Sequence, residues 1–453
     1  MFPLPALICL FSCACAAFAA ESVIVPGYLW KDTSGNVIQA HGAGMLKVGS
    51  TYYWYGEDKS LDSTLFKAVS CYESTDLVNW ARQNDALSPV ANTMISTSNV
   101  VERPKVLYNK LNSEYVMWFH SDTGNYGAAM VGVATAKTPC GPYTYKTSWQ
   151  PLGAESRDEG IFQDANQTSY LLYASDNNQN FKITRLDANY YNVTTNVQTL
   201  DGVTLEAPGI VKRNSVYWLI ASHTSGWAAN PNKYFSSTYL SGTWSAQNDL
   251  APANTNTASR YFSQNAYDLP LGTNAIYMGD RWRVDVLGSS QYIWYPLSWA
   301  SGVPQIVHAD VWSVDLAAGT YTVATGTSYE AESGTRSGSA TIASSSAFSG
   351  GEAVGYLGNG GSVTIKNVAG NGAGQWVSLY YANGDSTFRN TTVSVNGGAA
   401  VVVQQPNTGG GSVLLSVPVK LTLANGATNS ITVGAGQMNY AGDLDRIIVY
   451  TQG

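Results

Sequence analysis

The stretch GAGMLKVGSTYYWYGED (residues 42–58) reads as an apolar strand, a polar turn, and an aromatic-rich strand that ends in acidic residues. The same arrangement recurs four times before residue 310, in stretches that begin at residues 103, 161, 207 and 269. Candidate outer strands lie between these pairs, and we find no amphipathic helix of any length there. The sequence therefore predicts five units of about four strands each, which is the repeat of a five-bladed β-propeller.

A propeller brings the entries of its innermost strands together at one end of a funnel, whatever their separation in the sequence. In TLEAPGIV (204–211), Glu206 interrupts an otherwise apolar run. A buried carboxylate is costly unless it is paired or neutral. One alternative is an edge strand whose glutamate head lies in water. However, acidic residues also lie near the same end of other units, and these are Glu57, Glu102 and Asp158. This coincidence favours an acidic cluster, with Gln264 and Asp268 at the corresponding place in the fifth unit.

Such a cluster allows glycoside hydrolysis, which needs a carboxylic acid to protonate the leaving oxygen and a second group to direct the nucleophile. Glu206, flanked by apolar residues, suits the acid, and a neighbouring Asp158 would raise its pKa. Groups suited to sugar binding surround the cluster: Trp227 and Tyr126 for stacking, and Asn177, Asn178, Thr224 and Arg281 for hydrogen bonds. Each aromatic residue could instead be core packing. The motifs GxSxG, HExxH and CxxC are absent.

Composition limits the partners. Charged residues make up 12% of the 453 residues and the net charge is −7, which excludes the basic face that nucleic acids or anionic membranes require. We expect a monomer that binds a neutral, hydroxyl-rich polysaccharide. Residues 1–20 resemble a cleaved signal peptide, so we expect a secreted protein. In that compartment Cys71 and Cys140 can form a disulfide, and Asn166, Asn192 and Asn390 are glycosylation acceptors.

At HGAGML, YWYGEDKS, VVERPKV, SRDEGIFQD, LEAPGI, SHTSGW and SQNAYDLP the chain resembles glycoside hydrolase family 43, and more narrowly its fungal exo-β-1,3-galactanases. The resemblance implies a five-bladed propeller that releases galactose from the non-reducing end of the β-1,3-galactan backbone of arabinogalactan. It further implies inversion of configuration, bypass of β-1,6 side chains, and no cofactor for catalysis. Glu206 would be the general acid and Asp158 would tune its pKa, while Glu57 would be a substrate-binding residue.

One departure from the family leaves the base open. Most of the family has an aspartate base in the first blade, but this stretch reads NVIQAHGAG, without a carboxylate. The resemblance leaves Gln264 or Glu102 in its place. An amide binds protons very weakly, so Gln264 would orient water or act through its imidic tautomer. Glu102 could instead hold sugar hydroxyls. The alternatives for the whole protein are a catalytically inactive galactan-binding lectin, or a related α-L-arabinofuranosidase or β-xylosidase.

After Val323 the composition shifts to Gly, Ser, Thr and Val in alternating patterns, which predicts a second domain, a β-sandwich. We therefore expect a signal peptide over 1–20, a propeller over 21–325 and a carbohydrate-binding module over 326–453. Glu330 and Glu332 point the same way on one strand and, with Asp445, could bind Ca²⁺. The stretch resembles family 35 carbohydrate-binding modules, which implies a structural calcium on these residues. It also implies a set of sugar contacts: Tyr356, Asn383, Arg389, Tyr440 and Asp443.

Overall fold

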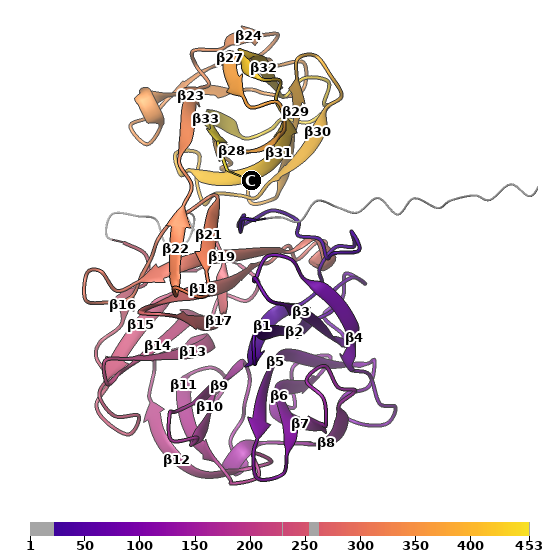
Figure 1. The fold of residues 1–453 in the computed structure, drawn as a ribbon, viewed down its shortest axis with the longest axis vertical. Helices are drawn as coiled ribbons and strands as arrows, with labels where there is room; N and C mark the ends of the chain where they lie inside the picture. The colour runs from indigo at the N-terminus through magenta and orange to yellow at the C-terminus, as the bar shows by residue number, and fades with distance from the viewer. Residues whose placement is uncertain (1–21, 229, 253–261, 453) are drawn as a thin grey trace, which may run out of the picture.

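The computed structural model describes residues 22–228, 230–252 and 262–452, so the predicted signal peptide lies outside the described residues. The described chain forms strands and three short 3-10 helices, at Pro151–Gly153, Leu287–Ser289 and Ser349–Gly351. Figure 1 shows a larger part built from residues up to 323 and a smaller part built from residue 326 onward. Nowhere in the described chain is a helix long and apolar enough to cross a membrane.

Five four-stranded sheets make up the larger part, and in each of them strands that are consecutive in sequence are neighbours. They are β1–β4 (His41–Val48, Thr51–Glu57, Val69–Ser74, Ala81–Leu87), β5–β8 (Asn99–Asn109, Glu114–Thr123, Met130–Ala136, Thr144–Trp149), β9–β12 (Glu159–Gln163, Ser169–Ser175, Asn180–Leu186, Val193–Leu200), β13–β16 (Leu205–Arg213, Val216–His223, Lys233–Ser237, Asn248–Asp249) and β17–β20 (Gln264–Leu271, Asn274–Arg281, Gln291–Ser298, Gln305–Ile306). A hairpin, β21–β22 (Trp312–Asp315, Thr320–Val323), follows.

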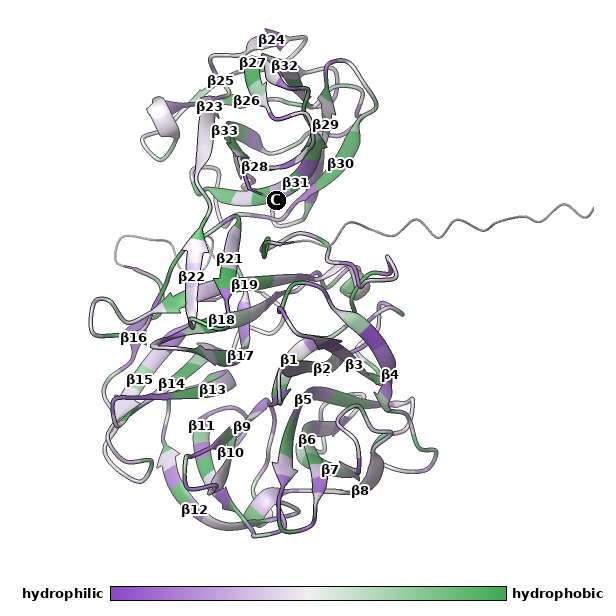
Figure 2. Cartoon of the chain, in the orientation of Figure 1, coloured by the Kyte–Doolittle hydropathy of each residue, from purple (hydrophilic) through white to green (hydrophobic). Residues whose placement is uncertain are grey.

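Each of these sheets packs against two others. In β6, Met117 and Phe119 join a core cluster with the first sheet, whereas Val116 and Trp118 join a cluster with the third. This division follows from the two-residue period of a strand. Similar clusters join the third sheet to the fourth and the fourth to the fifth, and Trp294 of the fifth packs against the first. The five sheets therefore close into a ring, with hydrophobic and hydrophilic residues alternating along many strands (Figure 2).

Four of the five innermost strands carry a register shift near their entry. The shifts lie between His41 and Gly44, Glu102 and Lys105, Glu206 and Gly209, and Asn265 and Tyr267. Three residues within them have positive φ, namely Gly42 (61°), Arg103 (53°) and Ala207 (55°). A bulge re-aims neighbouring side chains and is frequent beside functional sites. The repeated bulges therefore turn Glu102, Glu206 and Gln264 toward the same end of the ring.

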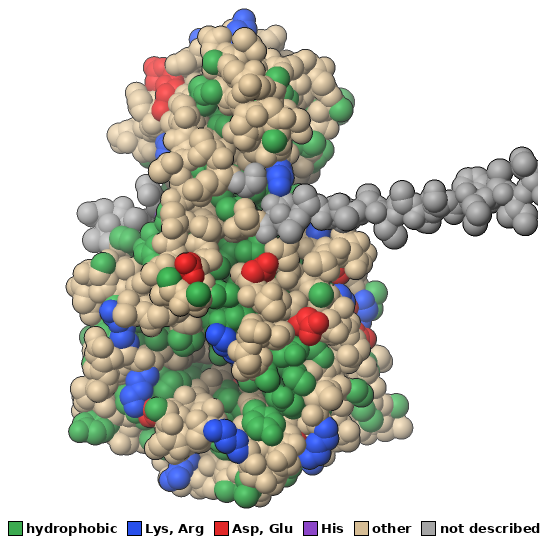
Figure 3. Space-filling model, viewed as in Figure 1, with side chains coloured by type: hydrophobic (Ala, Val, Ile, Leu, Met, Phe, Trp, Pro, Cys, Tyr) green, Lys and Arg blue, Asp and Glu red, His purple; other side chains and the backbone are tan. Residues whose placement is uncertain are grey.

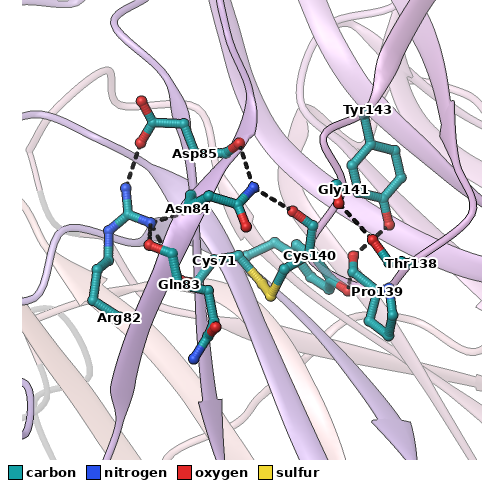
Figure 4. The surroundings of a disulfide bond; sticks show 11 residues. Cys71, Arg82, Gln83, Asn84, Asp85, Thr138, Pro139, Cys140, Gly141 and Tyr143 are labelled. Carbon is teal, nitrogen blue, oxygen red and sulfur yellow. Dashed lines mark hydrogen bonds and ion pairs between the residues drawn. A yellow bond between two sulfur atoms is a disulfide. The ribbon is translucent and has the colours of Figure 1, made fainter.

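A disulfide joins Cys71 of β3 to Cys140 after β7, with the two Cα atoms 5.6 Å apart (Figure 4). The predicted pairing is thus confirmed. Asn84 in β4 donates a hydrogen bond of 2.8 Å to the carbonyl of Cys140, beside the disulfide. The disulfide and this hydrogen bond both link the first sheet to the second, so they restrain the relative position of the two sheets.

The smaller part contains two sheets. One is six-stranded: β23 (Gly326–Glu330), β25 (Thr341–Ser344), β26 (Glu352–Gly355), β28 (Gly374–Ala382), β31 (Leu415–Thr422) and β33 (Asp443–Tyr450). The other is five-stranded: β24 (Thr335–Ser337), β27 (Ser362–Gly370), β29 (Arg389–Val395), β30 (Val401–Gln405) and β32 (Gly426–Val433). One core cluster takes Leu379 and Ile447 from the first sheet and Val363 and Ile431 from the second. The two sheets therefore pack face to face.

The two parts are joined through a buried carboxylate. Asp310, just before β21, accepts hydrogen bonds from the hydroxyls of Tyr380 and Tyr450 (both 2.6 Å) and of Ser416 (2.5 Å). Beside it, Val23 and Val311 pack against Trp376 of the smaller part. Few charged side chains lie on the face of the molecule in Figure 3, and they are scattered.

Neighbouring inner strands lie so close together that a larger residue between them should destabilise the fold. A Cβ atom on Gly44 of β1 would lie 2.1 Å from the backbone oxygen of Pro104 in β5. We therefore expect Gly44→Ala to lower the free energy of unfolding by about 1–3 kcal/mol or more, measured as a lower thermal midpoint. Gly411→Ala is the control, because a Cβ atom there meets nothing within 4 Å. Equal midpoints for the two variants would contradict this account of the ring.

Candidate active site

A cavity of about 260 Å³ opens at the end of the ring where the innermost strands begin. Side chains from all five sheets and their loops line it. Its lining residues are Glu57, Glu102, Arg103, His120, Tyr126, Arg157, Asp158, Asn178, Glu206, Gly226, Trp227, Gln264 and Trp282. The fold therefore gathers residues that lie more than two hundred positions apart in the sequence.

Glu206 on β13 faces this cavity with both carboxyl oxygens near amide donors. The Nδ2 of Asn178 lies 3.2 Å from Oε1, and the Nε2 of Gln264 lies 3.3 Å from Oε2. Burial, and then the negative charge of Asp158, raise the pKa of Glu206 to about 8. Glu206 therefore keeps its proton at neutral pH, which is what a general acid requires.

Arg103 on β5 lies at the centre of the site. Its Nε is 2.7 Å from Oδ2 of Asp158, and its Nη2 donates a hydrogen bond of 2.7 Å to Oε1 of Gln264. Its backbone N–H donates to Oε1 of Glu57 at 3.0 Å. The same Oδ2 of Asp158 also accepts a bond of 3.1 Å from the backbone N–H of Ala207, directly after Glu206. Asp158 is thus held as a charged neighbour of the acid.

Unlike Glu206, Glu102 is ionised at neutral pH. Burial works against its ionisation, but the hydrogen bond with His120 (3.2 Å) and the charge of Lys59 outweigh burial and hold the pKa of Glu102 at about 2. The hydroxyl of Tyr126 donates to it at 2.8 Å. His120 bonds on its other side to Asp122 at 3.0 Å. Two glutamates of one cavity therefore differ in charge at neutral pH, as an acid and an ionised partner must.

Eight of the predicted site residues line the cavity together: Glu57, Glu102, Tyr126, Asp158, Asn178, Glu206, Trp227 and Gln264. Three do not. Arg281 is 2% exposed and donates to the carbonyl of Phe262 instead, so it lies outside the lining and its predicted role in sugar binding gains no support. Asn177 is exposed and its backbone N–H bonds to Glu155, and Thr224 is half-buried outside the lining.

Sequence reasoning missed four side chains of the lining, namely Arg103, His120, Arg157 and Trp282. Three of them are immediate neighbours of residues that were singled out: Arg103 of Glu102, Arg157 of Asp158, and Trp282 of Arg281. Trp282 packs edge-to-face on Trp227, with ring centroids 5.0 Å apart. The usable signal was closeness in sequence to the chosen residues, because a bulge lets consecutive residues such as Glu102 and Arg103 face one cavity.

Within the described residues, one ligand atom each of Glu102, His120 and Asp158 lie within 4.8 Å of one another, as a metal site would need. Each group already has protein partners, because both ring nitrogens of His120 bond to carboxylates and Asp158 is paired with Arg103. The geometry is therefore explained without an ion.

The predicted sugar contacts of the smaller part separate into three groups by burial. Asn383 is 1% exposed and its amide donates to the carbonyls of Thr387 and Gln405, so these bonds hold a loop and the predicted sugar contact gains no support. Tyr356 and Tyr440 are exposed and lie edge-to-face, 5.9 Å between centroids. Two polar residues are half-buried: Arg389, which bonds to Asp385 and the carbonyl of Ala441, and Asp443.

Two of the three predicted calcium ligands have an unpartnered oxygen, whereas the carboxyl of Asp445 accepts hydrogen bonds from the backbone N–H of Ser349 and from Arg446. Oε2 of Glu330 and Oε2 of Glu332 are buried without a hydrogen-bond partner. Asp445 is fully buried, and burial, with contributions from Glu330 and Glu332, raises the pKa of its carboxyl to about 6. Buried carboxylate oxygens without donors are what a hard cation would satisfy.

Comparisons with known proteins agree with this site. The profile of glycosyl hydrolases family 43 matches residues 38–267. A crystal structure of an exo-β-1,3-galactanase from Phanerochaete chrysosporium with galactose is 72% identical, covers 94% of this chain and 100% of that chain, and gives a TM-score of 0.92. An exo-β-1,3-galactanase from Clostridium thermocellum is 31% identical over 87% of this chain and 88% of that chain, with a TM-score of 0.64. A comparison with curated protein sequences gives no match.

The acid, its charged neighbour and the enclosing cavity define a glycoside hydrolase. The chain belongs to glycosyl hydrolases family 43. This membership supports the enzyme over the inactive lectin. The profile that matches residues 362–449 is that of an alpha-galactosidase CBM13 domain, so it corrects the expected family 35 assignment of the module.

The electrostatics of the acid predict the pH dependence. Since Glu206 must be protonated and its pKa is raised to about 8, we expect kcat to fall as pH rises through that value. Asp158→Asn removes the charge that raises this pKa and leaves the positive charge of Arg103, so the basic limb of the kcat profile should move down by on the order of one pH unit. A basic limb that stays in place would show that Asp158 does not tune the acid.

Proposed function

We propose that this protein is a secreted exo-β-1,3-galactanase that releases galactose, with inversion, from the non-reducing end of the β-1,3-galactan backbone of arabinogalactan. The observation that carries the proposal is the position of Glu206 beside the Asp158–Arg103 pair in the cavity, where burial and Asp158 raise the pKa of Glu206. The Phanerochaete structures, with galactose in one and β-1,3-galactotriose in two others, support the substrate. The proposal includes bypass of β-1,6 side chains, which the family resemblance implies.

In this mechanism Glu206 donates its proton to the glycosidic oxygen as the bond to C1 breaks. Water then attacks C1 from the opposite face, directed by Gln264 or Glu102. The ring of Trp227 offers a surface on which a sugar can stack, and Asn178 lines the same cavity. Burial and the charge of the neighbouring Asp158 raise the pKa of Glu206, which favours the protonated acid.

We expect Glu206→Gln to lower kcat by at least about 10³-fold while KM changes little, because the amide keeps the shape of the cavity but has no proton to transfer. Galactose release from β-1,3-galactan measures this. Glu155→Gln is the control, because this carboxylate lies outside the lining. Normal turnover by Glu206→Gln would exclude it as the acid, and turnover of aryl arabinofuranosides or xylosides instead of galactan would change the substrate class.

We further infer that the ring of five sheets is the five-bladed propeller predicted from the sequence. The support is the four-stranded repeat and the packing of the fifth sheet against the first. We place the catalytic domain at residues 21–325 and the module at 326–453, because β22 ends at Val323 and β23 begins the next sheet at Gly326.

In the module we propose a structural Ca²⁺ held by Glu330, Glu332 and Asp445, and galactan contacts from the exposed pair Tyr356 and Tyr440. When bound, the ion would neutralise carboxylates that the fold buries together. It has no part in hydrolysis.

Calcium removal tests this site. We expect a chelator to lower the thermal midpoint of the whole protein by several degrees, and added Ca²⁺ to restore it, because binding to the native state alone is stabilising. Glu332→Gln should abolish this dependence, whereas Glu352→Gln, an exposed carboxylate nearby, should keep most of it. A midpoint that does not respond to Ca²⁺ would exclude the site.

We also propose that the protein is a secreted, monomeric glycoprotein. Asn166, Asn192 and Asn390 are all exposed, as glycosylation requires.

A further inference from the structure

One contact between the two parts of the molecule lies at the same end of the ring as the catalytic cavity. The guanidinium carbon Cζ of Arg283 lies over the ring of Phe388, 5.1 Å from the ring centroid. Arg283 lies just after β18, at the end where Asp280 pairs with Gln264 of the cavity. Phe388 belongs to the module and directly precedes β29. The module therefore meets the catalytic domain close to the cavity as well as at Asp310.

Arg283 belongs to the segment 282–290, which joins β18 to β19 and begins in the cavity wall. Trp282 lines the cavity and packs edge-to-face on Trp227, with ring centroids 5.0 Å apart. The far half of the segment is attached beside the first sheet, because the backbone N–H and carbonyl of Gly288 bond to side chains there at 2.9 and 2.8 Å. The half next to Trp282 needs a support of its own.

This nearer half is the more open one. Val284 is 61% exposed and Asp285 is exposed, whereas Arg283 is half-buried. The guanidinium group pairs with Asp285 through its edge, with Nε 3.2 Å from Oδ1. Its face lies on the ring of Phe388, and a cation over an aromatic face is attracted by the quadrupole of the ring. The module therefore supplies the cover of this half.

The loop that presents Phe388 is itself held. It joins β28 to β29, and Nδ2 of Asn383 donates to the carbonyl of Thr387 at 3.0 Å. On the other side of the ring, Nε of Arg389 donates to Oδ2 of Asp385 at 2.7 Å. Hydrogen bonds of the residues on both sides of Phe388 therefore restrict the loop and keep the ring against the catalytic domain.

We propose that Phe388 is a positioning residue through which the module helps to shape the catalytic cavity. Its ring holds the guanidinium group of Arg283, and the next residue along the chain is Trp282, so the contact limits movement of the indole in the cavity wall. The consequence for substrate binding rests on the proposed function. The module then acts on the cavity directly, in addition to any sugar that it binds itself.

The indole N–H of Trp282 gives a readout that needs no substrate. Its ¹H–¹⁵N signal in the NMR spectrum of the whole protein is assigned by its loss in Trp282→Phe. We expect Phe388→Leu to shift or broaden this signal, because Arg283 loses the aromatic face. Phe388→Tyr keeps the ring and should leave the signal near its wild-type position. A signal that Phe388→Leu does not change would overturn the inference.

Tyr380→Phe is the matched control, because it removes one hydrogen bond to Asp310 at the other link between the two parts and leaves Phe388 in place. We expect the Trp282 signal to stay unchanged in this variant. An equal change in Tyr380→Phe would overturn the inference, since any loosening of the two parts would then have the same effect.

The second readout is hydrolysis of β-1,3-galactotriose, a short substrate that reduces any contribution from polymer binding by the module. Phe388→Leu should raise KM about three- to tenfold with kcat changed less, because a mobile indole weakens binding in the ground state and the transition state alike. Phe388→Tyr should keep the wild-type KM. An unchanged KM in Phe388→Leu would overturn the inference. A wild-type protein that does not hydrolyse galactotriose would overturn the proposed function alone, and the indole signal would still decide the inference.

Discussion

The active site depends on the contacts that the guanidinium group of Arg103 makes. It joins Asp158 before the third sheet to Gln264 of the fifth, while its backbone N–H bonds to Glu57 of the first. Arg103 precedes a proline and has a positive φ of 53°, a costly conformation for a residue with a side chain. The bulge that contains Arg103 directs its positive charge toward the cavity, where several carboxylates lie. Without that charge, Asp158 would be a half-buried anion that has lost its ion pair, beside the acid Glu206.

The repeat of strand pairs and the positions of the acidic residues could be predicted from the sequence, because strand periodicity and bulk composition are local properties. Glu206 and Asp158 stood out as carboxylates at the entries of apolar strands. The sequence could not decide which of two neighbouring residues lines the cavity. In GDRW, Arg281 and Trp282 alternate, so one points into the interior and the other into the cavity. Asn177 and Asn178 lie in one turn, where the first is exposed and the second lines the cavity. The contacts of Arg103 join strands that no local pattern relates.

The module shows a similar division. Its alternating strands and its carboxylates in YEAE were visible in the sequence, and two of these carboxylates have oxygens buried without donors. The role of Asn383 was not visible, because an amide that binds sugar and an amide that closes a loop have the same sequence signal. Its burial decides between them. A few motifs also could not identify the family of the carbohydrate-binding module. The profile match to a CBM13 domain replaces the expected family 35 assignment.

The link at Asp310 affects how the enzyme meets a polymer. A buried carboxylate that accepts three hydroxyl hydrogen bonds, beside a packed apolar cluster, resists bending between the two parts. The module therefore keeps a fixed position relative to the catalytic domain. Any stretch of polysaccharide that binds to the module is held at a fixed distance and orientation from the catalytic cavity.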